Sequence, residues 1–214
     1  MIRMLVAACA LLFAACGGGN GPGPSLGVTG PPSAQTVAAN DSDWSGMHKC
    51  PESGSYDSYL KLEQTKAPDQ YQTDKTTWDD LKAAGANDSY IAAYAESASD
   101  CGQFNSGNAT GKVAYVYAIR FKDANSATTS FKSNTKDFHL DDPTVAQLKA
   151  AGATVSQGSA TGLGDNSIVV TIDVGGSAVY VAAWQKKSFE VAMVTFNDSS
   201  AGGQAATKIN GRIS

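Results

Sequence analysis

Residues 167–197 read SIVVTIDVGGSAVYVAAWQKKSFEVAMVTFN, and this stretch decides the fold class. Three apolar runs rich in β-branched residues are expected to be strands: residues 167–174, 177–186 and 189–197. Gly175-Gly176 is a strong signal for a two-residue hairpin turn, and residues 185–188 supply the next turn. The stretch therefore predicts an antiparallel three-stranded meander.

The hairpin turn also predicts how the first two strands pair, because a two-residue turn fixes the register of its strands. The expected pairs, moving outward from the turn, are Val174–Ser177, Ile172–Val179, Val170–Val181 and Ile168–Ala183. This register places a continuous apolar face against a helical layer. The opposite face mixes polar and aromatic side chains: Thr171, Asp173, Tyr180 and Trp184.

The region before the meander supplies a fourth strand and further helices. Residues 113–121 carry large apolar side chains at every second position, and the positions between them are also mostly apolar, which predicts an inner strand. Asp123, Asp142 before Pro143, and Asp198 can each cap a helix, and Gly152 can close the second of these helices. The predicted class is α+β, with a four-stranded antiparallel sheet and helices packed on one face.

The N-terminal half of the domain is expected to be helical. The first helix covers residues 54–66 and places Tyr56, Tyr59, Leu60 and Glu63 at helical spacing. Thr76 or Thr77 can cap a short helix that ends near Gly85, and Asn87 can cap another that continues to Ala98. Six aromatic residues of this half could line a pocket, although a helix–sheet core is favoured: Tyr56, Tyr59, Tyr71, Trp78, Tyr90 and Tyr94.

The first residues have the three parts of a secretion signal. Arg3 supplies a positive charge, and residues 4–15 form an apolar run that is shorter than the roughly 20 residues of a membrane-spanning helix. The run ends in Leu12-Phe13-Ala14-Ala15-Cys16, which resembles the signal of bacterial lipoproteins, with Phe13 where Leu is usual. The resemblance implies cleavage before Cys16 and its modification with lipid, including palmitate. Two or more acyl chains give stable membrane attachment.

The chain is accordingly divided into a signal peptide (residues 1–15), a lipid-anchored flexible linker (residues 16–43) and one domain (residues 44–214). The linker is rich in Gly, Pro, Ser, Thr and Asn and has few large apolar residues, so it is not expected to build a core. The anchor predicts a location at the cell membrane or outer membrane, on the side facing away from the cytoplasm.

Two cysteines remain in the predicted domain. An exported protein meets an oxidising compartment, so Cys50 and Cys101 are expected to form a disulfide. The alternative uses both cysteines and His48 as metal ligands, but His48-Lys49-Cys50 does not have a usual zinc spacing. The disulfide is favoured, and neither a metal nor a cofactor is expected.

The composition limits the possible partners and reactions. The net charge of −4, without a basic patch, argues against nucleic-acid binding. The sequence has no Gly-x-Ser-x-Gly motif, and the Gly-rich residues 158–164 lack the lysine of a phosphate-binding loop. His139 stands beside two aspartates, but a helix cap and a loop explain that stretch more simply. No catalytic residue is therefore predicted.

Residues 112–213 resemble the extracytoplasmic domains of uncharacterised lipoproteins and the sensor domains of some receptor kinases, a likeness carried by Gly162-Leu163-Gly164-Asp165 before a strand. The resemblance implies a two-layer α/β module. We expect a non-enzymatic module that binds or senses a small molecule, a lipid or an envelope protein, and the alternative is a cell-envelope hydrolase. Trp184, with Tyr180, is the best candidate for a ligand-binding aromatic, unless it packs under a helix as a second small core.

Overall fold

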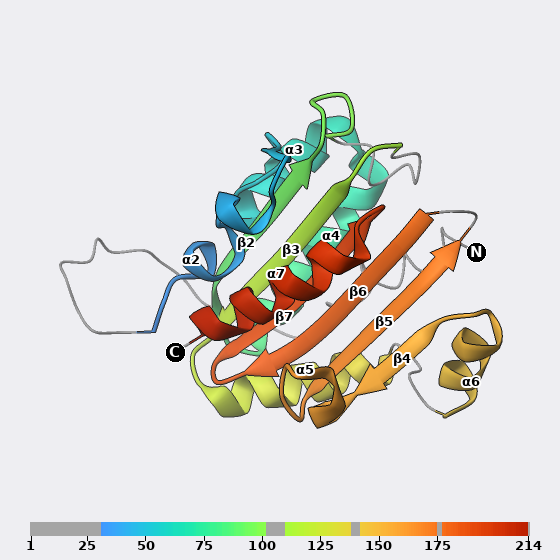
Figure 1. Cartoon of the computed structure of the whole chain (residues 1–214). Coiled ribbons are helices and arrows are strands. Elements are labelled where there is room, and N and C mark those ends of the chain that lie inside the picture. The colour runs from blue at the N-terminus through green and yellow to red at the C-terminus, as the bar shows by residue number, and fades with distance from the viewer. Residues whose placement is uncertain (1–30, 102–109, 138–141, 175–176, 214) are drawn as a thin grey trace.

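The computed structural model describes residues 31–101, 110–137, 142–174 and 177–213. They form one antiparallel seven-stranded sheet in the order β1-β2-β3-β7-β6-β5-β4 (Figure 1). In chain order the strands are β1 (His48–Lys49), β2 (Ala86–Ala95), β3 (Val113–Phe121), β4 (Thr154–Gln157), β5 (Ser167–Val174), β6 (Ser177–Lys186) and β7 (Phe189–Phe196). The α+β class and the antiparallel pairing are as predicted, but the prediction of four strands was wrong.

The meander of β5, β6 and β7 has the predicted register. Val174 lies opposite Ser177, and the pairing continues through Ile172–Val179 and Val170–Val181 to Ile168–Ala183. The turn residues Gly175 and Gly176 lie outside the described residues. β3 pairs with β7 along its length, which makes β3 an inner strand. The neighbouring strands β3 and β7 therefore come from segments that are far apart in the sequence.

β2 lies where the sequence predicted a helix capped by Asn87. It pairs with β3 from Ala86↔Phe121 to Ala95↔Val113. Ile91, Ala93 and Ala95 face one core of the protein, whereas Ala92 and Tyr94 face the other. A strand that is buried on both faces has consecutive apolar residues, and this pattern also satisfies helical spacing. The prediction of a helical N-terminal half failed for this reason.

The helices are α2 (Ala34–Ala38), α3 (Tyr56–Lys66), α4 (Pro68–Ala83), α5 (Ala124–Asp137), α6 (Asp142–Ala150) and α7 (Ser199–Arg212), with 3-10 turns η2 (Asp41–Asp43) and η4 (Gly158–Thr161). The carboxylates of Asp123 and Asp198 accept hydrogen bonds from the backbone at the starts of α5 and α7, as predicted. Thr76 and Thr77 lie inside α4, which starts at Pro68, so neither caps a helix. Gly85 and Gly152 follow α4 and α6 with φ of 104° and 88°, in agreement with their predicted closing role.

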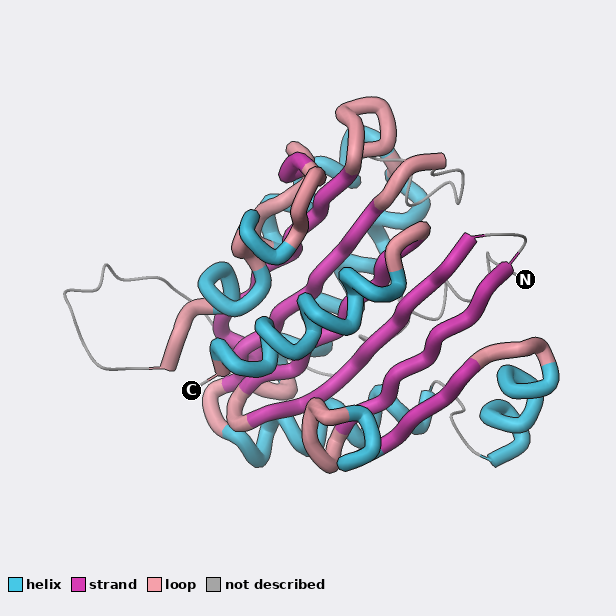
Figure 2. The backbone as a smooth tube through the Cα atoms, in the orientation of Figure 1, coloured by secondary structure: helices cyan, strands magenta, loops and turns pink. Residues whose placement is uncertain are grey.

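The helices cover both faces of the sheet, so the prediction of helices on one face was wrong (Figure 2). α3, α4 and α5 pack on the face that carries Ile91, Tyr115 and Ile168, and we call this side the first core. α2 and α7 pack on the opposite face and build the second core. Gly202 lets α7 approach the sheet closely, because a Cβ atom there would lie 2.8 Å from the side chains of Tyr180 and Thr195.

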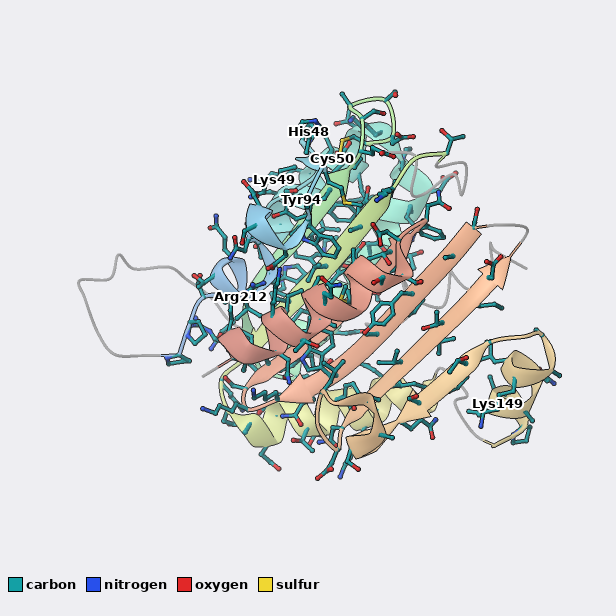
Figure 3. All side chains as sticks on the ribbon, in the orientation of Figure 1. His48, Lys49, Cys50, Tyr94, Lys149 and Arg212 are labelled. Carbon is teal, nitrogen blue, oxygen red and sulfur yellow. A yellow bond between two sulfur atoms is a disulfide. The ribbon has the colours of Figure 1, made fainter. Side chains whose placement is uncertain are left out.

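The folded part of the chain begins before residue 44. Val37 in α2 is buried, and Asp43 in η2 is also buried. Arg212, which is labelled in Figure 3, is the last residue of α7. It forms an ion pair with Asp43 at 2.7 Å and donates two hydrogen bonds to the carbonyl oxygen of Val37. The expected linker therefore ends earlier than residue 43, because a short apolar helix in it completes the second core. Among the described residues no helix is long and apolar enough to cross a membrane.

Candidate functional site

The aromatic pair singled out from the sequence is part of the second core. Trp184 is fully buried, and Tyr180 is 7% exposed. They share this core with Ala205, Ala206 and Ile209 of α7. The face of β6 that carries them is covered by α7. The sequence had predicted all helices on the opposite face. Trp184 and Tyr180 are therefore core residues, in agreement with the alternative stated for Trp184 and not with a ligand-binding role.

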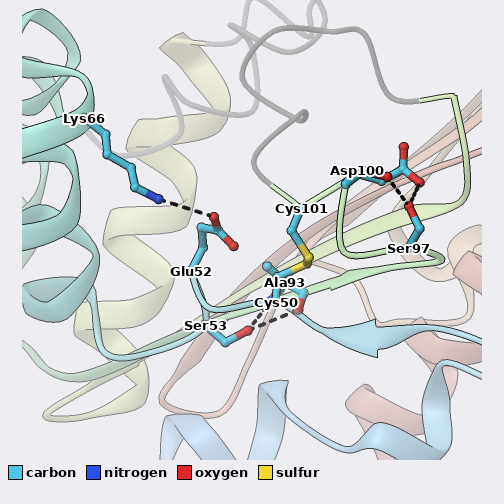
Figure 4. The surroundings of a disulfide bond; sticks show 9 residues. Cys50, Glu52, Ser53, Lys66, Ala93, Ser97, Asp100 and Cys101 are labelled. Atoms are coloured by element: carbon cyan, nitrogen blue, oxygen red, sulfur yellow. Dashed lines mark hydrogen bonds and ion pairs between the residues drawn. A yellow bond between two sulfur atoms is a disulfide. The ribbon is translucent and has the colours of Figure 1, made fainter.

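The remaining predicted residues lie in different places. Cys50 and Cys101 form the expected disulfide, with 5.6 Å between their Cα atoms. This bond joins the segment between β1 and α3 to the turn after β2 (Figure 4). His48 is exposed on β1. His139 and Cys16, the predicted lipidation site, lie outside the described residues.

The structure shows one concentration of ionisable side chains in the first core, where α3 packs against α4. We call Tyr59, Glu63, Gln70 and Asp74 the acid–tyrosine cluster. The Tyr59 hydroxyl donates a 2.6 Å hydrogen bond to Oε1 of Glu63, and Nε2 of Gln70 donates one of 3.0 Å to Oδ1 of Asp74. Asp74 lies close enough to Glu63 to raise the pKa of its carboxyl group. Glu63 is 4% exposed and Asp74 is 6% exposed, so the cluster is almost sealed from water.

The surroundings of Glu63 and Asp74 favour a bound proton. Both carboxyl groups are buried, and neither forms an ion pair with a described lysine or arginine. Burial raises the pKa of Glu63 and of Asp74 above their ordinary values, and the proximity of Asp74 raises that of Glu63 further. The raised pKa values of two neighbouring carboxyl groups favour a protonated form, so the pair is expected to keep a proton at neutral pH.

Tyrosines surround this acid pair. Burial raises the pKa of Tyr56 and of Tyr59 well above the usual range, and the nearby phenol of Tyr117 adds to both shifts. Tyr56 also stacks on Trp78, with 5.0 Å between the ring centroids. Tyr117 comes from the middle of β3 and is only partly buried. Tyr117 is therefore a more exposed neighbour of the acid–tyrosine cluster.

Another buried acid lies under α5. Glu190 of β7 is 6% exposed, and Nδ2 of Asn134 donates a hydrogen bond of 3.4 Å to its Oε2. Burial raises the pKa of Glu190 to about 8, although hydrogen bonds from Ser130 and Asn134 act in the opposite direction. Its Oε1 is buried and has no hydrogen-bond partner among the described residues. A pKa of about 8 favours the protonated form of Glu190 in the folded protein at neutral pH.

The burial of the acid pair argues against glycoside hydrolysis. In glycosidases the two carboxyl groups flank the bond that is cleaved, so the substrate must reach both of them. Glu63 and Asp74 are almost completely buried instead.

Sequence reasoning did not identify the cluster, although one signal pointed to it. Glu63 shares its helical spacing with Tyr56, Tyr59 and Leu60, so its carboxyl lies on the buried face of α3. A charged residue on an apolar helix face is uncommon, and this alone could have singled out Glu63. Asp74 lies on another helix, and only the packing of α3 against α4 brings the two together.

No protein-family model matches the chain, and no curated protein matches it. Among solved structures, the chain is similar to the extracellular domain of PknH from Mycobacterium tuberculosis. The two chains are 13% identical, the match covers 86% of this chain and 97% of the other, and the TM-score is 0.47.

Proposed function

We propose that the chain is a lipid-anchored extracytoplasmic module that binds a small molecule, a lipid or an envelope protein, and that α3 and α4 form its binding region. The anchor rests on the secretion signal and on Cys16 in its lipoprotein-like context. The disulfide supports an oxidising compartment outside the cytoplasm. The acid–tyrosine cluster supports the binding region.

The argument from the cluster is energetic. Burying two carboxyl groups without a cation lowers the stability of a protein, and an apolar pair would pack at less cost. Perturbed ionisable groups of this kind are concentrated at functional sites. Tyr117 acts on the pKa of Tyr56 and of Tyr59 and is only partly buried, so a ligand would approach the cluster at this tyrosine. A ligand with hydroxyl or amine groups would find both donors and acceptors in this region.

The competing function is a cell-envelope hydrolase. The carboxyl groups of a hydrolase must reach the bond that is cleaved, and Glu63 and Asp74 are too deeply buried for that role. We therefore propose binding rather than catalysis.

Native mass spectrometry of protein released from its own membrane tests this function. We expect a non-covalent ligand on the wild-type protein and on the control variant Glu96→Gln, which changes an exposed glutamate. The ligand should be lost from a Glu63→Gln, Asp74→Asn double variant. Equal retention by both variants would place the ligand elsewhere, and wild-type protein that carries neither a ligand nor a partner would contradict the proposal.

A further inference from the structure

The disulfide has a carboxylate beside it. Sγ of Cys50, Sγ of Cys101 and a carboxylate oxygen of Glu52 all lie within 4.8 Å of one another (Figure 4). A sulfur in a disulfide has no negative charge and is not the form of cysteine that binds metals. Reduction would replace the bond by two thiols, which are metal ligands once they lose their protons. The same three residues would then offer two sulfur ligands and one oxygen ligand.

The spacing suits a small tetrahedral ion. With Zn–S bonds of about 2.3 Å and Zn–O bonds of about 2.1 Å, neighbouring ligand atoms lie roughly 3.5–3.8 Å apart. The Cα atoms of the two cysteines are 5.6 Å apart. The sulfur atoms would have to move apart to hold such an ion, which rotation of the two side chains can supply.

Glu52 is available as a ligand. Its Oε2 is buried and has no hydrogen-bond partner among the described residues. Its Oε1 lies 3.9 Å from Nζ of Lys66, whose side chain is 63% exposed. An ion pair with such an exposed lysine is weak, so a metal ion could replace the lysine as the partner of this carboxylate. Cys50 is buried and Cys101 is only partly buried, so an ion would enter on the side of Cys101.

We propose that the reduced protein binds one zinc-like divalent cation through Cys50, Cys101 and Glu52, with a water molecule as the fourth ligand. A dithiol or phosphine reductant supplies the two electrons that cleave the S–S bond, and each sulfur takes up a proton. The cation then displaces both thiol protons and leaves two thiolates bound to it. This site does not depend on the proposed binding function. It would keep the segment after β1 joined to the turn after β2 when the disulfide is absent.

Titration with Co²⁺, used as a spectroscopic substitute for Zn²⁺, tests the proposal. The full chain is reduced with a phosphine, freed of reductant under argon and titrated. We expect thiolate-to-cobalt charge-transfer absorption, saturation at one ion per chain and release of two protons per ion. The oxidised protein should show none of these signals. Thiolate absorption without saturation at one ion per chain, or no absorption at all, would overturn the site.

Glu52→Gln separates a built site from two free thiols. This variant keeps both cysteines, so its fold can be verified in the oxidised form before reduction. Loss of one of three protein ligands should weaken Co²⁺ binding by at least about tenfold. The control Glu96→Gln changes an exposed glutamate that precedes Cys101 in the chain, and it should leave the affinity unchanged. Equal affinities of Glu52→Gln and wild-type protein would remove Glu52 from the site and refute the proposal.

Discussion

Glu190→Gln should make the protein more stable, and increasingly so as the pH rises. The pKa of Glu190 is about 8 in the folded chain, against 4.5 for an ordinary glutamate. Between these values the folded chain binds a proton that the unfolded chain has lost. The stability contributed by Glu190 is therefore fully present below pH 4.5 and is lost as the pH rises through about 8. Glutamine has nearly the same shape, can accept the hydrogen bond from Asn134, and does not titrate.

The size of the effect follows from the difference between the two pKa values. The free energy of unfolding of the variant, relative to wild-type protein, should increase by about 2.5 kcal/mol between pH 5 and pH 7. Urea unfolding at several pH values, followed by tryptophan fluorescence, measures this difference. The control Glu96→Gln makes the same chemical change at an exposed glutamate and is measured in the same way. A difference for Glu190→Gln that stays constant with pH would refute the reasoning that Glu190 is protonated in the fold.

Three further predictions concern the anchor, the disulfide and the second core. Cys16→Ala should release the protein from membranes or leave an uncleaved precursor, so a variant of mature size that stays with the membrane would contradict lipidation at Cys16. Thiol labelling of the unreduced, delipidated chain should find no free thiol, whereas labelling of both Cys50 and Cys101 would contradict the disulfide. Trp184→Ala should lower stability by about 3–5 kcal/mol, and a melting curve close to that of wild-type protein would show that Trp184 is not a core residue.

The sequence predicted local features better than the arrangement of the layers. The register of β5 and β6 was predicted because these strands are neighbours joined by a two-residue turn. β2 was not predicted, because burial on both faces removes the alternation that identifies a strand. The two-residue β1 and the four-residue β4 are too short to carry a pattern of their own. The side of the sheet that each helix covers depends on packing, and this is why Trp184 was placed on an open face.

The candidate site was less accessible to sequence reasoning. The Cys50–Cys101 bond followed from the number of cysteines and the expected compartment. Glu63 and Asp74 form a pair only when α3 folds back on α4, and no motif records that contact. Glu190 follows the turn after β6 in a strand that is buried on both faces, so its position did not distinguish a core carboxyl from an exposed one.

The contact between α2 and α7, the first and last described helices, affects the order of folding. Val37 accepts its hydrogen bonds from Arg212, which lies 175 residues later in the chain, and the central strand β3 must wait for β7. The native topology therefore cannot close until almost the whole polypeptide has been synthesised, and such distant contacts slow folding. For a chain that carries a secretion signal, as proposed here, late closure would leave an unfolded substrate for the export channel and delay the final collapse until the far side of the membrane.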